Sequence, residues 1–291
     1  MPLPSVGRTR AGAGRPASRP AAPGEARART LIPAERQARI VEIIRRQGAA
    51  SIHAIALAMK ASVSTIRRDL EELTERGYLD RTHGGAIQRS RFRTTFEPSQ
   101  EIAGRLAHAE KLAIARHAAS LIGAGQSVAF DSSSTVLEAA RAVAMRRIPL
   151  TAVTNDLRIG QELGLAEGVK VILTSGALRE GSMTLVGETA IAFISRLKVD
   201  IALIGIHSLE GLRPSETSLE VAAVKRAFIA SGRKVLLLAD STKFDSPAFT
   251  EIGGLELFEE LVTDQGIAAS VRRSVEKRGV KVTVVRPGGA A

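Results

Sequence analysis

The stretch from Ser62 to Leu70 constrains this chain more than any other feature. It reads Ser-Val-Ser-Thr-Ile-Arg-Arg-Asp-Leu. Ser62 is a good helix N-cap, because its hydroxyl can accept a hydrogen bond from a free backbone N–H of the first turn. Val63, Ile66 and Leu70, with Leu73 beyond them, recur at helical spacing. The pattern therefore predicts a short helix that begins after Ser62 and buries one apolar stripe.

The polar face of this predicted helix carries side chains that suit DNA. Ser64, Thr65 and Arg68 fall outside the apolar stripe, because successive helical residues are about 100° apart. Short hydroxyl side chains and an arginine near the start of a helix suit contacts with bases and phosphates in a major groove. This segment alone is equally compatible with an ordinary amphipathic surface helix.

The residues before Ser62 predict two further helices. Residues 34–47 show a helical apolar pattern that Gly48 ends, and Ser51 caps a second short helix. A tight turn at Lys60-Ala61 leads into the Ser62 helix. Helix, helix, turn, helix is the order of a helix-turn-helix motif, with the last helix as reader. The apolar residues expected in the first two helices are Ile40, Ile43, Ile44, Ile52, Ile55 and Leu57.

The residues after Gly77 predict a wing. Two short strand-like pieces lie around Gly84-Gly85, a pair typical of a hairpin turn. The basic side chains expected to line this hairpin are Arg81, His83 and Arg89. A winged helix-turn-helix over residues 32–90 is therefore favoured over a purely structural three-helix unit.

The distribution of charge agrees with a nucleic-acid partner. The chain has 41 Lys and Arg against 30 Asp and Glu, a formal charge of +11. About +5 of this lies in residues 1–31, about +5 in 32–93 and about +1 in the remainder. A basic membrane-surface helix would also be positive. However, the apolar residues of 34–89 are placed as a globular core requires, and no basic helix has an aromatic insertion face.

Composition excludes several classes of site. The chain has no cysteine, so disulfides, thiolate metal sites and cysteine nucleophiles are excluded. Its five histidines lack metal-ligand spacing, and we predict neither a metal nor a cofactor. No apolar run is long enough for a membrane span. Residues 1–31 read as a disordered basic tail without a secretory signal, or as the product of a mis-assigned start codon. We expect a cytoplasmic protein.

Beyond a polar linker at residues 91–106, the pattern becomes that of an α/β domain. Short apolar runs alternate with helical stretches over residues 107–286, which predicts a mostly parallel sheet covered by helices. Ligands of such sheets bind at the carboxyl ends of the strands. The predicted strands are Ser127–Phe130, Leu150–Val153, Val169–Leu173, Ile201–Ile206, Val235–Leu238, Leu261–Val262 and Val282–Val285.

A run of hydroxyl side chains follows the first of these strands. The sequence Asp131-Ser132-Ser133-Ser134-Thr135 comes directly before a predicted helix. Free N–H groups and the helix dipole attract anions at a helix N-terminus, and hydroxyl groups can add hydrogen bonds. The run is neither a Walker loop nor a dinucleotide fingerprint. A simple N-cap needs only one hydroxyl, and four in a row favour a phosphate site.

Other strand ends also carry polar side chains. Asn155 and Thr174 offer amide and hydroxyl groups suited to the hydroxyls of a sugar. Lys243 is the best single cation for a phosphate or an anomeric oxygen. Each alone is more often a turn former or a solvated lysine. Their shared position at strand ends is the argument for a common site.

Taken together, the motifs resemble those of the DeoR family of bacterial transcriptional regulators, from about Ile32 to Val285. The resemblance implies a winged helix followed by a sensor domain similar to sugar-phosphate isomerases. Family members are typically repressors of carbohydrate-use operons that release DNA when a phosphorylated sugar binds. The matching stretches are Val63–Leu70, Arg81–Ala86, Glu110-Lys111, Ile114-Ala115, Asp131–Thr135, Val153–Asn155, Val186-Gly187, Val224–Arg226 and Ala239–Phe244.

The resemblance also implies roles for single residues. Arg67 would join Ser62, Ser64, Thr65 and Arg68 in the DNA interface. Residues 132–135 would hold the phosphate, with Lys225 and Lys243 in the same pocket. The chain departs from the family pattern in two places: His207-Ser208 stands where members commonly have Asp-Gly, and 174–176 has one glycine where two are usual.

We therefore expect a DNA-binding repressor that senses a phosphorylated sugar. Its partners would be a double-stranded operator, the sugar phosphate and further copies of itself, because paired half-sites suit oligomers. No catalytic residue is assigned. The alternative is a sugar-phosphate isomerase-like enzyme that carries a DNA-binding module. Isomerisation needs a positioned carboxylate base, for which Glu220 and Asp240 are the candidates.

Overall fold

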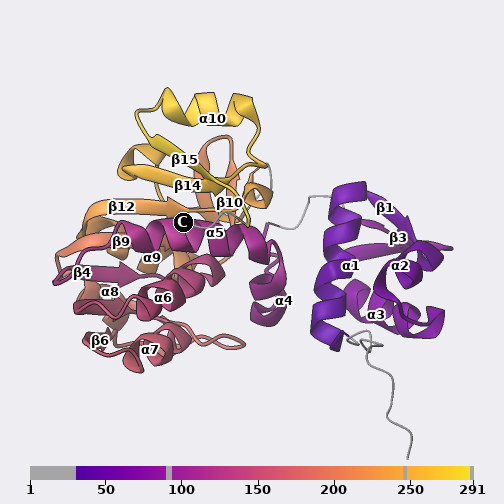
Figure 1. Cartoon of the computed structure of the whole chain (residues 1–291), viewed down its shortest axis with the longest axis horizontal. Helices are drawn as coiled ribbons and strands as arrows, with labels where there is room; N and C mark the ends of the chain where they lie inside the picture. The colour runs from indigo at the N-terminus through magenta and orange to yellow at the C-terminus, as the bar shows by residue number, and fades with distance from the viewer. Residues whose placement is uncertain (1–30, 90–93, 245–247, 289–291) are drawn as a thin grey trace, which may run out of the picture. The chain divides into compact units, whose positions relative to one another are not determined.

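A computed structural model describes residues 31–89, 94–244 and 248–288. The predicted basic tail therefore lies outside the described residues, apart from Leu31. Figure 1 shows the elements of the N-terminal part in indigo and purple and those of the α/β part from magenta to yellow.

Three helices form the core of the N-terminal part, as the sequence predicts. They are α1 (Pro33–Gln47), α2 (Ile52–Met59) and α3 (Val63–Glu75). Ser51 accepts from the Ala54 N–H at 3.2 Å and Ser62 from the Thr65 N–H at 3.1 Å, so both predicted N-caps are confirmed. Of the apolar residues expected to be buried, Ile43 is only partly so, and Leu57 is exposed because it lies on the outer side of α2.

The predicted wing is a hairpin of β2 (Leu79–Thr82) and β3 (Gly85–Gln88). A third strand that the sequence did not predict, β1 (Ala49–Ser51), pairs antiparallel with β3. Gly85 is required here, because a Cβ at this position would lie 2.1 Å from the Ala50 carbonyl oxygen. The wing is therefore anchored to the segment that joins α1 to α2.

The stretch predicted as a linker contains a short helix, α4 (Gln100–Arg105). Ile102 is buried with the residues of the winged-helix core. Lys111, on α5 (His108–Ser120), donates from Nζ to the Ala103 carbonyl oxygen at 2.5 Å. The second half of the predicted linker thus has a defined structure, which its polar composition does not predict.

Within the described residues, seven strands form one parallel sheet in the order β15-β14-β12-β9-β4-β5-β6. Every predicted strand is present, with ends that differ by a few residues. Their bounds are β4 (Ser127–Phe130), β5 (Leu150–Thr154), β6 (Val169–Leu173), β9 (Val199–Gly205), β12 (Gly232–Leu238), β14 (Glu260–Asp264) and β15 (Lys281–Val285). The predicted fold class, a winged helix-turn-helix followed by a mostly parallel α/β domain, is confirmed.

Helices cover both faces of this sheet (Figure 1). On one face, α5, α6 (Ser134–Met145) and α7 (Leu157–Gly164) pack over Val128, Phe130 and Leu203. On the other, α8 (Glu188–Ile194), α9 (Leu219–Ser231) and α10 (Ala269–Glu276) contribute to a second apolar cluster. Alanine, valine, leucine and isoleucine make up most of both clusters, which agrees with the low aromatic content.

Several small elements lie between the strands of the sheet in chain order. One antiparallel sheet joins β10 (Ser208–Glu210), β11 (Arg213–Glu216) and β13 (Thr250–Glu251). A hairpin pairs β7 (Ala177–Leu178) with β8 (Leu185–Val186). Two short 3₁₀ helices are η1 (Ser241–Lys243) and η2 (Leu255–Leu257).

Candidate functional site

The strand order defines a position where ligands bind in folds of this kind. From β4 the chain runs outward through β5 and β6, and then returns to the other side of β4 with β9. The connections from β4 and β9 therefore diverge, which opens a crevice at the carboxyl ends of these two strands. Residues 131–134 follow β4, and Ile206-His207 follows β9. The hydroxyl run thus lies at the topological switch point.

Gly205 allows these two connections to approach each other closely. A Cβ at this position would lie 2.1 Å from the Ser133 hydroxyl oxygen and 2.5 Å from its Cβ. The Gly205 N–H also donates to the Asp131 carboxylate at 2.9 Å. A side chain at this position would push the Ser133 loop away from the end of β9.

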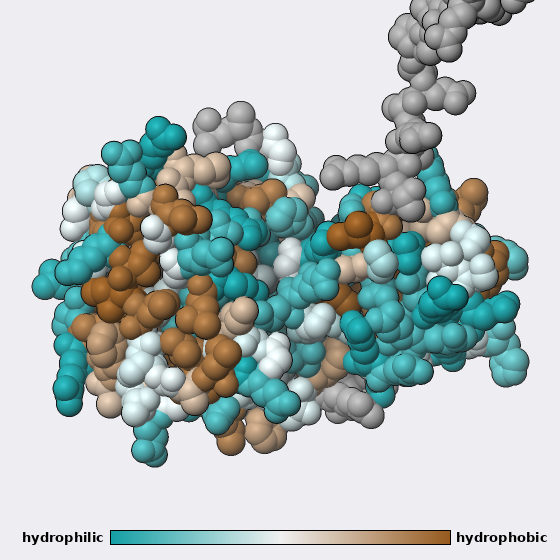
Figure 2. Space-filling view, turned by 90° about the horizontal axis from the view of Figure 1, so that it is seen from below, coloured by the Kyte–Doolittle hydropathy of each residue, from teal (hydrophilic) through white to brown (hydrophobic). Residues whose placement is uncertain are grey.

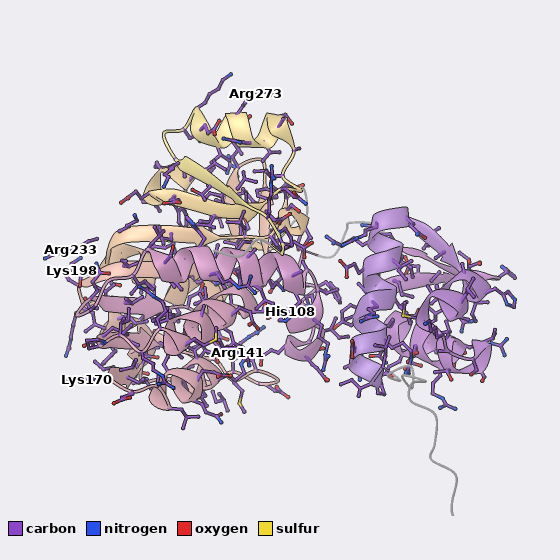
Figure 3. The ribbon with its side chains drawn as sticks, viewed as in Figure 1. His108, Arg141, Lys170, Lys198, Arg233 and Arg273 are labelled. Atoms are coloured by element: carbon purple, nitrogen blue, oxygen red, sulfur yellow. The ribbon has the colours of Figure 1, made fainter. Side chains whose placement is uncertain are left out.

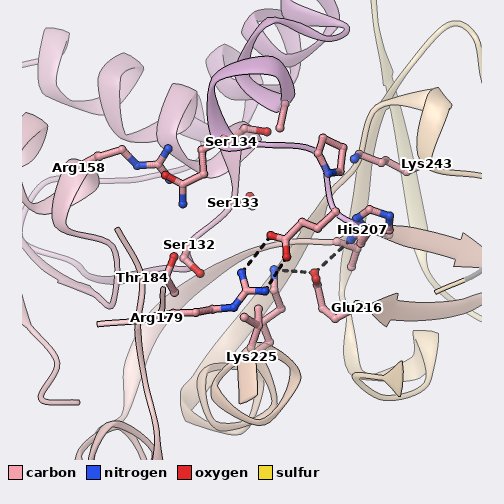
Figure 4. A pocket seen from close by; sticks show the side chains of 16 residues that line it. Ser132, Ser133, Ser134, Arg158, Arg179, Thr184, His207, Glu216, Lys225 and Lys243 are labelled. Carbon is pink, nitrogen blue, oxygen red and sulfur yellow. Dashed lines mark hydrogen bonds and ion pairs between the residues drawn. The ribbon is translucent and has the colours of Figure 1, made fainter. Parts of the chain in front are cut away.

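A pocket opens at the switch point (Figure 4). Its polar lining has hydroxyl, basic and acidic groups. Arg158 and Arg179 lie on one side of the pocket, and His207 and Lys243 lie on the other. The polar and charged lining residues are Glu97, Gln100, Ser132, Ser133, Ser134, Arg158, Arg179, Thr184, His207, Glu216, Lys225 and Lys243.

The N-terminus of α6 forms one wall of the pocket. Ser133 is the N-cap residue, and its hydroxyl accepts from the Val136 N–H at 3.1 Å. The first N–H groups of a helix have no carbonyl partner within the helix. Ser132 and Ser134 also line the pocket. This wall can therefore bind an anion through N–H and O–H donors.

A buried lysine on α9 lies behind this wall. Lys225 Nζ is 2.6 Å from Asp131 Oδ2, 2.6 Å from the Gly205 carbonyl oxygen and 3.1 Å from Glu216 Oε1. Burial opposes the charged ammonium, but the Asp131 and Glu216 carboxylates together raise the pKa of Lys225. Lys225 is therefore a charged group that ties β4, β9 and β11 together.

His207 contributes a neutral ring to the pocket. Burial, with the nearby Lys243 and Lys225 ammonium groups, lowers the pKa of His207 to about 3. Its backbone N–H donates to Glu216 Oε1 at 3.1 Å. At neutral pH the ring can donate from one nitrogen and accept at the other, so it suits a sugar hydroxyl better than an anion.

Two arginines approach from the β5 and β6 side. Arg158, the second residue of α7, donates to both carboxylate oxygens of Asp156 at 3.1 and 2.5 Å. Asp156 is fully buried and also caps α7 through the Arg158 and Ile159 N–H groups. Arg179 follows β7 and pairs with Glu97 at 2.8 Å. The pocket therefore holds two guanidinium groups in addition to Lys243.

The structure brings together part of the predicted effector site. Ser132, Ser133, Ser134, Lys225 and Lys243 line the same pocket. The other predicted residues, Asp131, Thr135, Asn155 and Thr174, are buried and are not among its lining residues. Asp131 pairs with Lys225, and the Asn155 amide donates to the Leu185 carbonyl oxygen at 3.0 Å.

Sequence reasoning missed Arg158, Arg179, Glu216 and Glu97 as pocket residues. Arg158 had one usable signal, since it comes two residues after the polar end of a predicted strand. Arg179 follows a two-residue strand, Glu216 ends a short antiparallel strand, and Glu97 lies in the predicted linker. Nothing in their local pattern distinguishes them from surface charges.

The predicted DNA-reading face of α3 is exposed. Ser62, Ser64, Arg67 and Arg68 are exposed, and Thr65 is half-buried. The Ser62 hydroxyl lies 2.8 Å from the hydroxyls of Ser64 and Thr65, which gathers three hydroxyls at the start of the helix. Ile66, Leu70 and Leu73 are fully buried on the opposite face.

Two further contacts fix the orientation of α3. Asp69 is nearly fully buried and pairs with Arg36 of α1 at 2.5 and 3.0 Å, so this residue of the motif has a structural role. Arg81 of the wing donates to Glu71 of α3 at 2.8 Å. His83, at the wing turn, is exposed.

Among the residues that the structure describes, no group of three or more His, Asp or Glu side chains is placed to hold a metal ion. In the same described part of the chain, no helix combines the length and apolar character needed to cross a bilayer.

Two family models match the chain. Residues 36–92 match the DeoR-like helix-turn-helix domain, and residues 106–265 match the DeoR C-terminal sensor domain. The two matched segments contain α3 and the pocket-forming strand ends respectively.

The chain matches several named relatives over nearly their whole length. The chain is 34% identical to the HTH-type transcriptional regulator GlpR of Haloferax volcanii, over 87% of this chain and 98% of the relative. It is 34% identical to the transcriptional repressor AccR of Agrobacterium fabrum (86% and 96% covered). It is 31% identical to the glycerol-3-phosphate regulon repressor of Escherichia coli (80% and 91% covered).

Solved structures give more distant matches. Ribose 5-phosphate isomerase A of Methanocaldococcus jannaschii is 14% identical with a TM-score of 0.35, over 46% of this chain and 53% of that chain. The translation initiation factor eIF-2B of Pyrococcus horikoshii is 15% identical with a TM-score of 0.40, over 77% and 78%.

Proposed function

Because the chain belongs to the DeoR family of DNA-binding transcriptional regulators, we propose that it represses a carbohydrate-use operon and leaves its operator when a phosphorylated sugar binds. Relatives named as repressors of such regulons support this proposal. One structural observation carries the proposal of a phosphorylated effector. The N-terminus of α6 and the side chains of Arg158 and Lys243 line one pocket at the switch point of the sheet.

In this proposal the phosphate binds at the start of α6. The N–H groups of the first turn and the hydroxyls of Ser132 and Ser134 donate to its oxygens. Lys243 provides countercharge, since phosphate at neutral pH carries between one and two negative charges, and Arg158, although paired with Asp156, adds its remaining N–H donors. The neutral His207 ring and Thr184 then face the sugar hydroxyls. Lys225 acts indirectly, because it holds Asp131 and Glu216 in place behind the pocket.

The DNA interface follows from the exposed face of α3. We propose that Ser62, Ser64, Thr65, Arg67 and Arg68 contact an operator in the major groove. Arg81 and His83 of the wing contact the adjacent backbone or groove. The basic charge of residues 1–93 supports this assignment, since phosphate contacts supply most of the sequence-independent affinity.

We propose that the pocket binds its ligand without turnover. Of the two candidate bases of an isomerase, Glu220 is exposed and Asp240 is fully buried, and neither is among the pocket residues. Glu216 is in the pocket, but its Oε1 is held by the Lys225 ammonium and the His207 backbone N–H. None of these carboxylates is placed as a free base beside the proposed sugar site.

We also propose a cytoplasmic homo-oligomer. Figure 2 shows hydrophobic side chains gathered on the face of the α/β part that carries α7 and the edge strand β6. Leu165, which directly follows α7, and Leu173 of β6 are exposed. Exposed apolar patches often mark protein interfaces. Leu165→Glu should lower the molar mass in solution, measured by light scattering, and an unchanged mass would count against this interface.

Calorimetry tests the proposed effector. Wild-type protein is titrated with pentose and hexose phosphates and with the same sugars lacking phosphate. At least one phosphate ester should bind, and its parent sugar should bind far more weakly. Lys243→Ala should weaken the phosphate ester about tenfold or more, since hydrogen bonds to charged groups contribute about 1.5–3 kcal/mol. Lys198→Ala, a change at an exposed lysine, is the control. Equal binding of sugar and sugar phosphate would refute the phosphate site.

A further inference from the structure

One cation of the pocket is paired with a carboxylate from outside the matched sensor domain. Arg179 donates to both oxygens of Glu97, at 3.3 and 2.8 Å. The Thr217 hydroxyl donates to the same carboxylate at 3.3 Å. Glu97 precedes α4, in the segment between the two matched domains. The side chain of Glu97 therefore lines the pocket beside Arg179.

The two arginines of the pocket differ in how firmly they are held. The partner of Arg158 is Asp156, which is two residues away, fully buried and needed to cap α7. The partner of Arg179 is 82 positions away in the chain, and its side chain is 40% exposed. Glu97 also pairs through a planar two-bond geometry that any ligand carboxylate or phosphate can reproduce. The Arg179 pair is therefore the one that can open without unfolding its surroundings.

The proposed phosphate site leaves Arg179 unused. The start of α6, Arg158 and Lys243 already provide donors and countercharge for one phosphate. We infer that Arg179 is a second anion subsite, which Glu97 occupies until an effector with a second acidic group displaces it. This inference rests on the proposed function, because it assumes that the first phosphate binds at α6. The effector class is then a phosphorylated sugar acid or a sugar bisphosphate.

The neighbours of Glu97 give its displacement a consequence. The Phe96 ring packs edge-on against Tyr78, with ring centroids 5.2 Å apart, and the Ser99 N–H donates to the Tyr78 hydroxyl at 2.7 Å. Tyr78 in turn follows α3 and donates its N–H to the Leu73 carbonyl oxygen at 2.8 Å. A ligand that displaces Glu97 therefore moves a segment that contacts Tyr78, a residue just after α3.

Matched ligand pairs test the subsite by calorimetry. The probes are glucose 6-phosphate against gluconate 6-phosphate, and glycerol 3-phosphate against 3-phosphoglycerate, with inorganic phosphate as the shared group. In each pair the second member adds one carboxylate, and the two pairs differ in length. Glu97→Gln keeps the shape of the side chain and removes its charge. Glu251→Gln, in the exposed Glu251–Arg213 pair, is the control.

The subsite predicts a selective effect. In at least one pair the acid should bind wild-type protein more tightly than its neutral partner. Glu97→Gln should tighten binding of that acid a further 2- to 5-fold, roughly the range expected for a partly exposed ion pair, and change binding of the neutral partner less than 2-fold. Arg179→Gln should remove the preference for the acid. Glu251→Gln should change none of these affinities.

Three results would overturn the inference. If Glu97→Gln increases the affinity for both members of a pair equally, Glu97 acts only through general repulsion of anions. If the phosphates bind but neither acid is preferred, Arg179 is no anion subsite, and the proposed function survives. If neither inorganic phosphate nor any probe binds the wild type, the phosphate site and the inference both fail.

Discussion

Individual side chains of α3 divide between buried residues that stabilise the fold and exposed residues that we propose contact DNA. Within the run Ile66-Arg67-Arg68-Asp69-Leu70, the apolar residues are fully buried and Asp69 is held by Arg36. The two arginines between them are exposed. Changes at Arg67 or Arg68 should therefore alter binding without altering the core.

Arg68→Ala should weaken binding to a selected operator by about 1–3 kcal/mol if its guanidinium contacts a guanine in two places. The melting temperature should stay within a degree or two, because no buried contact is lost. Fluorescence anisotropy at fixed salt measures the affinity. Arg273→Ala, on the outer surface of α10 (Figure 3), removes the same charge and is the control. Equal affinities for wild type and Arg68→Ala would remove Arg68 from the interface.

The burial of Lys111 makes the free energy of unfolding depend on pH. It is nearly fully buried, and burial lowers its pKa to about 8, although Asp240 opposes this effect. The folded protein therefore releases this proton at a lower pH than the unfolded chain, whose lysines titrate near 10.4. Between these two values the unfolded state binds more protons, so stability from this group rises with pH.

Urea unfolding at pH 8 and pH 10.5 measures this effect. Lys111 should add roughly 3 kcal/mol to the free energy of unfolding over this range, at 1.36 kcal/mol per pKa unit. Lys111→Met should lack this gain. Lys170→Met, at an exposed lysine on β6 (Figure 3), should retain it. The same pH dependence in wild type and Lys111→Met would show that another group is responsible.

At the scale of elements, the pocket depends on how closely the β4 and β9 connections approach. The loop with Ser133, before α6, can lie this close to the end of β9 only because Gly205 has no side chain. Gly205→Ala should shift this loop, since its Cβ would start 2.1 Å from the Ser133 hydroxyl. Overpacked sites of this kind typically cost about 1–3 kcal/mol.

The expected result for Gly205→Ala is a loss of sugar-phosphate affinity of tenfold or more, measured by calorimetry, with operator affinity unchanged. Gly164→Ala, in α7, is the matched control, because a Cβ there meets no atom within 4 Å. Undiminished ligand binding by Gly205→Ala would mean that the ligand does not use the start of α6.

The elements that the sequence predicted are those with a strong periodic or apolar signal. The seven parallel strands are apolar because both faces of the sheet are covered, and α3 has a clean stripe and a cap. The elements it missed, such as β7, β8 and β13, have only two residues, too few for a period. The sequence did not predict α4, because only Ile102 of its six residues is buried and no apolar period results.

The candidate site was predictable only where residues follow long strands. Ser132 to Ser134 and Lys243 lie in the pocket because they follow β4 and β12 within a few residues. The same rule failed for Asn155 and Thr174, which also follow strands but face the interior. Arg179 and Glu97 are 82 positions apart in the chain and meet only in the folded structure. No local sequence pattern around either residue predicts this ion pair.

At the scale of the whole molecule, one ligand must change the affinity of a distant helix for DNA. A ligand can shift a two-state equilibrium only through its different affinity for the two states. Reciprocity then requires operator DNA to weaken effector binding by the same factor. The segment 94–106 contacts both the pocket, through Glu97, and the residue that follows α3, through Phe96. It is the element expected to carry this coupling.

We propose that a phosphate bound at the start of α6 controls the affinity for operator DNA. The most direct test is an anisotropy titration of the operator complex with the tightest-binding sugar phosphate and with its parent sugar. The phosphate ester alone should release the operator. Lys243→Ala should bind the operator as the wild type does and need about tenfold more ester for release. Release by the parent sugar at the same concentration, or an unshifted curve for Lys243→Ala, would show that this phosphate does not control operator binding.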